Sequence, residues 1–329
     1  MTQLPDPQSL LSREDAGTAF AAILDGTVSD DAIAAFLVAL SERGETATEI
    51  AAAAAALRER LIPIEAPDNA IDVCGTGGDG HHTLNVSTAV SLVVAACEVP
   101  VAKHGNRAAS SKAGAADTLE ALGLDMQVAG DKAQETLADL GICFLFAANH
   151  HPAMRRIQPI RKEIGRRTIF NLMGPLANPA GVKRQLIGIA RPGYVHVYAK
   201  ALAELGTERA MIVSGDEGLD ELSLAGGNEV ADITADAVLM RRLYPAEAGL
   251  AEYPVSAIRG GDAEYNAAAL RRLLQGEKGP YRDAVLFNSA ASLMVAGEVD
   301  NLRDGVEEAA EALDKGLANA LLDCWIAYT

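Results

Sequence analysis

The chain has 329 residues, 49% of them hydrophobic and only 4% aromatic, and its 28 basic and 45 acidic side chains give a net charge of −17. This length and apolar content allow a large buried core and predict two domains rather than one. The excess of acidic side chains argues against nucleic acid as a partner, because such binding depends on neutralising phosphates. No run of apolar residues approaches the length of about 18 that a membrane span needs.

Residues 1 to about 65 have the pattern of helices alone. No signal peptide is evident at the N-terminus, so we expect a cytoplasmic protein. Thr46 and Glu49 match a capping box before a long Ala-rich run. Pro63 and Pro67 then end the helical pattern. The predicted helices cover residues 6–20, 29–44 and 46–61. This module shows no chemistry, and we expect it to be structural.

From residue 70 onward, short apolar runs alternate with helical patterns, which is typical of an α/β domain with a mainly parallel sheet. A continuous apolar run such as 142–147 indicates a strand that is covered on both faces. The expected strands are 70–74, 99–102, 142–147, 185–190, 209–213 and 284–288, with a strand-rich excursion over 225–251. The expected helices begin near Asn85 and then cover 111–122, 131–140, 194–205 and 304–322.

Residues 149–181 interrupt this alternation with a helical segment that is punctuated by prolines. Residues 149–191 carry nine Lys or Arg side chains and one carboxylate, Glu163. This local positive charge indicates an anion site, although a solvated helix face explains most of these residues equally well. We therefore predict a small all-α domain (1–66, joined by about 160–181) and an α/β domain (67–159 and 182–329), in which helices flank a mainly parallel central sheet.

The four cysteines are widely separated in apolar segments, and no pair has zinc-ligand spacing. We expect all of them to be buried free thiols. Cys74 adjoins a glycine-rich turn, but no activating base accompanies it, which argues against a nucleophile.

The glycine-rich turn, residues 75–80 (GTGGDG), separates the run 70–74 from the helix that begins near Asn85. A strand, a glycine loop and a helix N-terminus together form a phosphate site, because free N–H groups and the helix dipole face the anion. The turn fits neither a P-loop nor GxGxxG well, and a plain tight turn would also explain its glycines. Asn85, Ser87 and Thr88 add more hydrogen-bonding side chains than an N-cap requires.

A second polar cluster, Lys103 to Arg107 (KHGNR), follows the expected strand 99–102. Cations at the carboxyl end of a strand suit the crevice where open α/β sheets bind ligands. His104 is equally compatible with a structural role.

Asp220 and Glu221 form an acidic pair just after Gly218. Adjacent carboxylates can bind Mg²⁺, which prefers one or two carboxylates together with water and substrate phosphates. A solvated acidic turn is the alternative explanation.

Taken together, these motifs resemble the anthranilate phosphoribosyltransferases, the tryptophan-pathway family among the nucleoside phosphorylase-like transferases. The matching segments occur in the family's order and spacing and extend over nearly the whole chain: GTGGDG, NVST, KHGNRAASS, HHPAMRRIQPIR, RTIFNLMGPLANP and GLDE. A glycine loop with KHG would fit several related families. The combination with HPAM, RTIFN and the acidic pair is much more specific.

The resemblance implies transfer of the phosphoribosyl group from 5-phosphoribosyl-1-pyrophosphate (PRPP) to the amine of anthranilate, with release of pyrophosphate and with two Mg²⁺ ions per active site. Ser87 and Glu221 would hold one ion, and Asp220 with Glu221 the other. Arg161 would bind the anthranilate carboxylate, and Gly75 and Asn106 would also contact anthranilate.

The resemblance also implies a set of PRPP-binding residues. At the diphosphate end these would be Gly75, Gly78, Asp79, Thr83, Asn85, Ser87 and Thr88. The phosphate and ribose would contact Lys103, Asn106, Arg107, Ala108, Ala109, Ser110 and Ser111, and the substrate-binding set is completed by Val86, His104 and Gly105.

Ala115 departs from the family pattern, in which a serine is common, so one phosphate donor is missing unless Ser111 compensates. A neutral aryl amine is already nucleophilic, so we expect catalysis by positioning of the substrates rather than through a covalent intermediate, with His104 able to orient the acceptor.

The family also implies a homodimer through the N-terminal helices. The alternatives are a pyrimidine nucleoside phosphorylase-like enzyme and a non-catalytic, nucleic-acid-binding relative; RTIFN argues against the first and the charge of −17 against the second.

Overall fold

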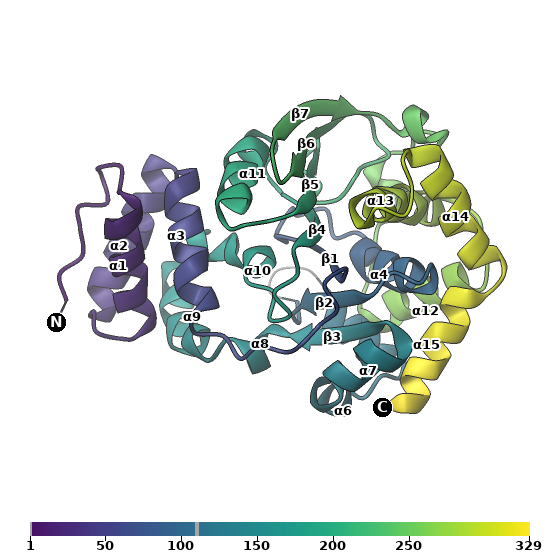
Figure 1. Ribbon diagram of the computed structural model, residues 1–329, viewed down its shortest axis with the longest axis horizontal. Helices are drawn as coiled ribbons and strands as arrows, with labels where there is room; N and C mark the ends of the chain where they lie inside the picture. Colours follow the sequence, from purple (N-terminus) through teal and green to yellow (C-terminus); the bar gives the residue numbers. More distant parts are fainter. Residues whose placement is uncertain (1, 109–111) are drawn as a thin grey trace.

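The computed structural model describes residues 2–108 and 112–329, which contain one seven-stranded sheet (Figure 1). The strand order is β3-β2-β1-β4-β5-β6-β7; the pairings from β3 to β5 are parallel, and β6 and β7 are added antiparallel. The predicted α/β class with a mainly parallel sheet is therefore confirmed. The strands are β1 (Ile71–Gly75), β2 (Val101–Gly105), β3 (Ile142–Phe146), β4 (Arg184–Gly188), β5 (Arg209–Gly215), β6 (Asn228–Thr234) and β7 (Val238–Leu243).

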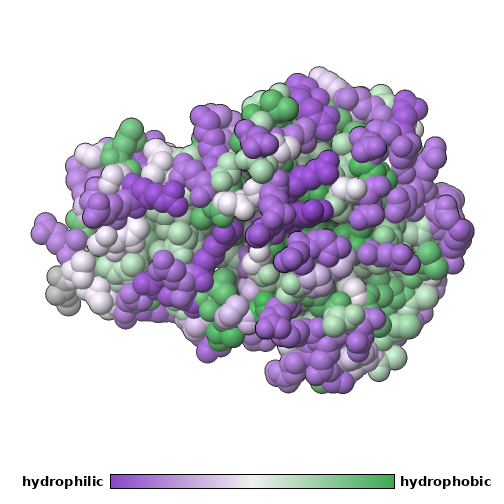
Figure 2. Space-filling model, viewed as in Figure 1, coloured by the Kyte–Doolittle hydropathy of each residue, from purple (hydrophilic) through white to green (hydrophobic). Residues whose placement is uncertain are grey.

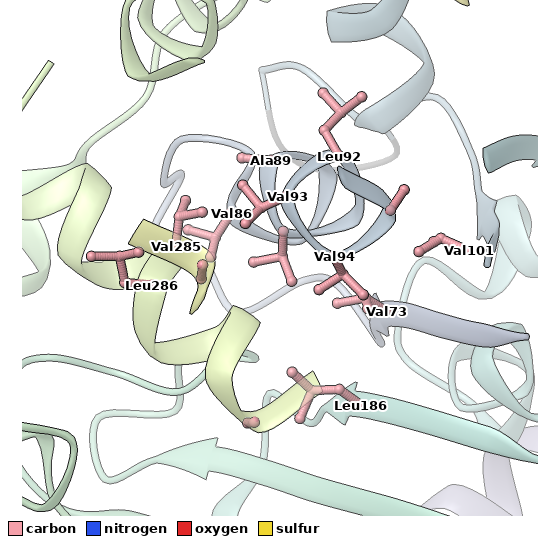
Figure 3. Packing of buried hydrophobic residues seen from close by; sticks show 14 of the residues in the cluster. Val73, Val86, Ala89, Leu92, Val93, Val94, Val101, Leu186, Val285 and Leu286 are labelled. Atoms are coloured by element: carbon pink, nitrogen blue, oxygen red, sulfur yellow. The ribbon is translucent and has the colours of Figure 1, made fainter. Parts of the chain in front are cut away.

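One face of the sheet is covered by α4 and by the C-terminal helices, and α4 is buried along nearly its whole length. Figure 3 shows the side chains of α4 between Val73 of β1, Leu186 of β4 and Val285 of α13. The helices on this side and at the β3 edge are α4 (Val86–Ala96), α5 (Ala115–Ala121), α6 (Met126–Asp131), α7 (Ala133–Leu140), α12 (Ala263–Leu274), α13 (Pro280–Ala296), α14 (Leu302–Asp314) and α15 (Leu317–Tyr328).

The other face carries α11 (Val195–Glu204), which also contacts α3 and so joins the sheet to the N-terminal helices. Neighbouring strand residues divide between the two cores, with Leu186 on the α4 side and Ile187 on the α11 side, as the alternation of a strand requires. The remaining elements are α1 (Arg13–Leu24), α2 (Asp30–Arg43), α3 (Ala47–Arg58), α8 (Ala147–His150), α9 (Pro152–Ile164), η1 (Ile169–Asn171), α10 (Met173–Leu176), η2 (Pro192–Tyr194), η3 (Pro245–Ala248) and η4 (Val255–Ile258).

The basic segment runs beside the N-terminal helices (Figure 1). α9 contacts α1 and α2, and α10 contacts α3. Arg156 pairs with Asp30 at 3.4 Å, and Arg166 pairs with Glu42 at 2.8 Å. These two ion pairs tie the segment to acidic residues of the N-terminal helices.

The predicted capping box at the start of α3 is confirmed. The Thr46 side chain accepts from the Glu49 N–H, and the Glu49 carboxylate accepts from the Thr46 N–H at 2.8 Å. Ser29 occupies the N-cap of α2, but its side chain makes no capping hydrogen bond.

The expected strand 284–288 is wrong, because these residues lie inside α13. α13 is buried on nearly all sides, so its apolar residues show no helical stripe, and a short window of it cannot be distinguished from a buried strand. The strand-rich excursion over 225–251 is confirmed as β6 and β7.

Several expected boundaries shift. The helix expected over 6–20 begins only at Arg13, and the one expected over 304–322 is two helices, because Gly316 adopts φ +72° between α14 and α15. The helix expected from residue 111 begins at Ala115, and the one expected from 131 is preceded by the separate α6.

The cysteines are free, but only Cys74 and Cys143 are buried, while Cys324 is exposed, so the expectation of four buried thiols is corrected. Burial raises the pKa of Cys74, which makes its thiolate rarer and agrees with the absence of a nucleophilic role. No helix among the described residues is long and apolar enough to cross a membrane.

Candidate active site

The candidate residues gather where parallel strands end at the same edge of the sheet. β1 ends at Gly75, β2 at Gly105 and β5 at Gly215, and the glycine loop, residues 75–80, leads from β1 towards α4. The carboxyl ends of parallel strands form the crevice where open α/β sheets bind ligands. Figure 2 shows hydrophilic side chains across the middle of this face, between the N-terminal helices and the sheet.

Two glycines allow the acidic pair to pack directly onto the strand ends. A Cβ on Gly75 would lie 2.3 Å from the Asp220 Oδ2 atom, and a Cβ on Gly188 would lie 1.6 Å from the Asp220 carbonyl oxygen. Any larger residue at either position would displace Asp220. The strand ends and the acidic pair therefore lie in direct contact. The sequence predicted that both contribute to one site, and that prediction needs such contact.

Both carboxylates accept from main-chain N–H groups of the expected phosphate site. The Gly77 N–H donates to Asp220 Oδ2 at 2.6 Å, and the Ser87 N–H in the first turn of α4 donates to Glu221 Oε1 at 3.2 Å. These are the kinds of donor that bind phosphate at a glycine loop and a helix N-terminus. Main-chain N–H groups therefore bind carboxylate oxygens at the glycine loop and the start of α4, for which the sequence predicted a diphosphate.

The electrostatics of the acidic pair favour a bound cation. Burial and the neighbouring Asp79 raise the pKa of Asp220, and burial and Asp220 raise the pKa of Glu221, although Lys103 opposes the second shift. Like charges held together in a partly buried site repel, and a divalent ion would relieve that repulsion.

The donor set fits Mg²⁺ better than a metal bound by protein alone. Within residues 2–108 and 112–329, no group of three His, Cys, Asp or Glu side chains is arranged to hold a metal ion. The site offers two carboxylates and the Ser87 hydroxyl, all oxygen donors. Mg²⁺ commonly binds such sparse oxygen sites, with water and substrate phosphates completing its shell.

Lys103 lies within β2 and not after the strand, where the sequence placed it. Only 2% of its surface is exposed, and its Nζ donates to the Val73 carbonyl at 2.7 Å and to Ser87 Oγ at 3.4 Å. Burial lowers its pKa, and Asp72 on β1 opposes this. Lys103 thus places a positive charge beneath the acidic pair.

His104 is also buried, and both its ring nitrogens have protein partners. Its Nδ1 donates to the Gly174 carbonyl at 2.9 Å, and its Nε2 lies 3.2 Å from His151 Nε2. Burial lowers the pKa of His104 to about 3 and that of His151 to about 4, so both rings are neutral at pH 7. His104 is therefore a poor candidate for a general base.

Asn85 connects the start of α4 to three other elements. Its Oδ1 accepts from Thr118 Oγ1 of α5 at 2.6 Å and from Asn266 Nδ2 of α12 at 2.8 Å. Its main-chain carbonyl accepts from the Tyr281 hydroxyl at 3.1 Å. Asn85 thus contributes to the shape of the site through its protein contacts.

The turn after β2 is arranged by α5. The Arg107 guanidinium donates to Asp117 at 3.0 Å and to Glu120 at 2.7 Å, and the Ala108 N–H donates to Asp117 at 2.9 Å. Asn106 is exposed beside them. The predicted contacts Ala109, Ser110 and Ser111 lie outside the described residues.

The remaining PRPP candidates differ in accessibility. Gly78 is exposed and Asp79 partly so, with the Asp79 carboxylate accepting from the His81 N–H at 3.0 Å. Thr83 pairs with Arg259 in an isolated bridge. Val86 and Thr88 are buried in α4, 1% exposed each, and among the described residues the Thr88 hydroxyl has no hydrogen-bond partner.

Arg161 of α9 is half-buried, and among the described residues its guanidinium has no hydrogen-bond or ion-pair partner. Burial lowers the pKa of its guanidinium, which nevertheless remains charged at neutral pH. A partly desolvated cation without a carboxylate nearby is a strong anion-binding candidate.

Sequence reasoning missed three buried polar residues that organise the site. Asp72 accepts from the His104 N–H at 3.1 Å, His151 touches the His104 ring, and Asn266 holds Asn85. A carboxylate inside an apolar strand was a readable signal for Asp72, because a buried charge needs partners. Nothing local marked Asn266.

Family models cover most of the chain. Residues 8–61 match the helical bundle domain of a glycosyl transferase family, and residues 67–319 match its a/b domain. The chain is 72% identical to the anthranilate phosphoribosyltransferase of Novosphingobium aromaticivorans over 99% of both chains. It is 74% identical to that of Sphingopyxis alaskensis over 98% of both.

Solved structures agree with these relatives. The anthranilate phosphoribosyltransferase of Thermus thermophilus superposes with a TM-score of 0.92 at 45% identity, covering 98% of this chain and 96% of that one. The Saccharomyces cerevisiae enzyme in complex with PRPP and Mg gives 0.88 at 31% identity, covering 97% and 93%. The same yeast enzyme in complex with 4-fluoroanthranilate gives 0.85 at 29% identity, with the same coverage.

Proposed function

The chain belongs to the anthranilate phosphoribosyltransferase family, and we propose that its reaction takes place at the carboxyl ends of β1, β2 and β5. The activity is transfer of the phosphoribosyl group of PRPP to the amine of anthranilate in tryptophan biosynthesis, with release of pyrophosphate. The glycine loop, the first turn of α4 and the acidic pair supply the groups that this reaction needs at a sugar diphosphate.

The diphosphate of PRPP binds along the glycine loop and the first turn of α4. Main-chain N–H groups there already hold two carboxylates, at Gly77 and Ser87, which supports their use for phosphate oxygens. The ribose end and its 5-phosphate lie towards Asn106 and the turn that begins at Arg107. Of the remaining predicted contacts, Gly75, Gly78, Asp79 and Thr83 lie on the loop side.

Two Mg²⁺ ions accompany PRPP in this proposal. Ser87 with Glu221 would hold one, and Asp220 with Glu221 the other, because these oxygen donors converge and carry excess negative charge. When bound, the ions supply charge neutralisation for the departing pyrophosphate. Lys103 lies beneath the pair and limits how much the carboxylates repel one another.

Anthranilate enters from the side of α9. The guanidinium of Arg161 pairs with its carboxylate, and Gly75 and Asn106 lie beside its ring. The carbon–nitrogen bond forms as the carbon–oxygen bond to pyrophosphate breaks, and the amine proton is lost afterwards. A neutral aryl amine requires little basic assistance, which is consistent with the low pKa of His104. Because both ring nitrogens of His104 have protein partners, we propose that it helps to orient the acceptor through its buried contacts with Gly174 and His151, and that no covalent intermediate forms.

Three further features complete the proposal, of which the first is implied by the family and the other two by the sequence pattern. They are a homodimer through the N-terminal helices, a cytoplasmic location, and the division into a helical domain (1–66 with about 160–181) and an α/β domain. Light scattering coupled to gel filtration tests the first, and a monomer at micromolar concentration would contradict it.

The convergence of Asp220 and Glu221 on the glycine loop and α4 carries the proposed site. The direct test mixes the pure protein with anthranilate, PRPP and Mg²⁺ and follows the change in fluorescence as product forms. Turnover that requires all three is the expected result. Absence of turnover together with phosphorolysis of uridine would favour a nucleoside phosphorylase instead.

A further inference from the structure

Arg167 follows α9 in the chain, and its guanidinium lies against the glycine loop. Its Nη2 donates to the Gly77 carbonyl at 2.5 Å and would lie 3.2 Å from a Cβ placed on Gly78. Within residues 2–108 and 112–329 it forms no ion pair with a carboxylate. One hydrogen bond uses only one of the five N–H donors of a guanidinium, so a positive charge with unused donors covers the loop.

The main chain of Arg167 is tied to the N-terminal helices. Ser41 of α2 donates from its Oγ to the Arg167 carbonyl at 3.1 Å. Gly77, whose carbonyl accepts from Arg167, donates its own N–H to Asp220 at 2.6 Å. Three hydrogen bonds therefore connect α2, Arg167, the glycine loop and the acidic pair.

Gly77 and Gly78 need such support more than ordinary loop residues do. Both have left-handed backbones, with φ +70° and +75°, and both are exposed. Glycine loses more conformational freedom on ordering than any other residue. A charged donor that holds one loop carbonyl lowers the ordering cost when an anion binds.

We propose that Arg167 is a positioning residue, which holds the glycine loop in its diphosphate-binding shape and links that shape to the position of α2 and α9. This inference rests on the proposed function, because it assumes that the loop binds the diphosphate. Arg161 lies on α9, six residues earlier in the chain. The short segment from Arg161 to Arg167 therefore connects the proposed anthranilate contact to the proposed diphosphate loop.

The test compares Arg167→Ala and Arg167→Lys with Arg166→Ala. Arg166 is the matched control, because it is exposed, pairs with Glu42 at 2.8 Å and, among the described residues, makes no hydrogen bond to the loop. Isothermal titration with Mg²⁺ and pyrophosphate measures diphosphate affinity, and steady-state kinetics measure KM for each substrate. For Arg167→Ala we expect about a tenfold loss of pyrophosphate affinity and a similar rise in KM for PRPP, the size of one charge-assisted hydrogen bond. KM for anthranilate should change less than about twofold.

Arg167→Lys should recover part of the affinity, because an ammonium can still donate to the Gly77 carbonyl. Ser41→Ala is the second variant: it removes the anchor on the main chain and should weaken pyrophosphate binding in the same direction but less. If Ser41 acts through Arg167, the double variant should match Arg167→Ala alone.

The inference fails if wild type binds pyrophosphate and Arg167→Ala binds it equally well. It also fails if both KM values rise together in parallel with a fall in Tm, since that pattern indicates a structural role only. Failure of the wild type itself to bind Mg²⁺ with pyrophosphate would overturn the proposed site, and with it this inference.

Discussion

The two carboxylates after β5, Asp220 and Glu221, bind the main chain of both the glycine loop and α4. Asp220 and Glu221 accept hydrogen bonds from the Gly77 and Ser87 N–H groups, the donors that we propose for the diphosphate. The carboxylates thus satisfy donors that would otherwise face water. If the proposed site is right, these N–H groups exchange carboxylate for phosphate partners when the diphosphate binds.

A double substitution tests that arrangement. Asp220→Asn with Glu221→Gln keeps the acceptor oxygens for both N–H groups but removes two negative charges. We expect the Mg²⁺-dependent rate to fall by at least about a hundredfold, while metal-free pyrophosphate binds no more weakly than to wild type, because repulsion is lost. Reaction rates across a series of Mg²⁺ concentrations measure the first effect, and titration with pyrophosphate in the absence of metal measures the second. An unchanged Mg²⁺ dependence would refute the metal assignment. A far-ultraviolet circular dichroism spectrum checks that the variant is folded.

Arg161 is the residue-scale test of the acceptor side. Arg161→Ala removes a half-buried guanidinium without a described protein partner, so folding should suffer little. KM for anthranilate should rise about 10- to 100-fold, as expected for a lost hydrogen-bonded ion pair, and KM for PRPP far less. Arg155, exposed on the same helix, provides the control substitution Arg155→Ala; an equal rise in both KM values would contradict the assigned contact.

At the scale of single elements, the start of α3 depends on one buried carboxylate. Glu49 is fully buried; Arg43 pairs with it, and the Thr46 N–H and the Leu11 N–H, at 3.1 Å, donate to it. Burial alone would raise the pKa of Glu49, but these hydrogen bonds outweigh burial and lower it below 4.5. The ionised form is thus the one that the fold stabilises.

The sign of the resulting pH dependence follows from that lowered pKa. The contribution of Glu49 is fully present above its ordinary pKa of 4.5 and is lost as the pH falls through the lower folded value. Glu49→Gln should lower the free energy of unfolding by about 1–3 kcal/mol at pH 7. Urea unfolding at several pH values measures this, and the gap between wild type and variant should narrow below about pH 4.5; a gap that widens there would contradict the assignment.

At the scale of the whole molecule, the site joins parts that lie far apart in the sequence. The glycine loop and the acidic pair come together because β1, β4 and β5 are neighbours in the sheet, and α9, packed on α1 and α2, leads to Arg167, which contacts that loop. Ligands that contact all three parts should stabilise the molecule as one unit.

Thermal unfolding with ligands tests that coupling. PRPP with Mg²⁺ at about 100 times its dissociation constant contributes about 2.7 kcal/mol, which should raise Tm by several degrees. PRPP without metal should raise it much less, because the acidic pair then repels the diphosphate. Differential scanning calorimetry provides the measurement, and equal shifts with and without Mg²⁺ would argue against the metal-assisted site.

Local chemistry alone determined much of this protein. The capping box at Thr46, the strand that leads into the glycine loop and the strand-rich excursion over 225–251 could be predicted, because each depends on neighbours in sequence. The family motifs also identified the activity. Where burial removed the periodic signal, as within α13, the same reasoning failed.

Only the tertiary structure decided which polar groups are free to act. Lys103 and His104 were expected just after a strand but are buried within β2, with partners on other elements. Arg167 reaches the glycine loop from a segment about 90 residues away, and Asn85 is held by α5 and α12. These contacts join residues distant in sequence, and no local pattern encodes them, because they arise from how the sheet orders its strands and how the helices pack upon it.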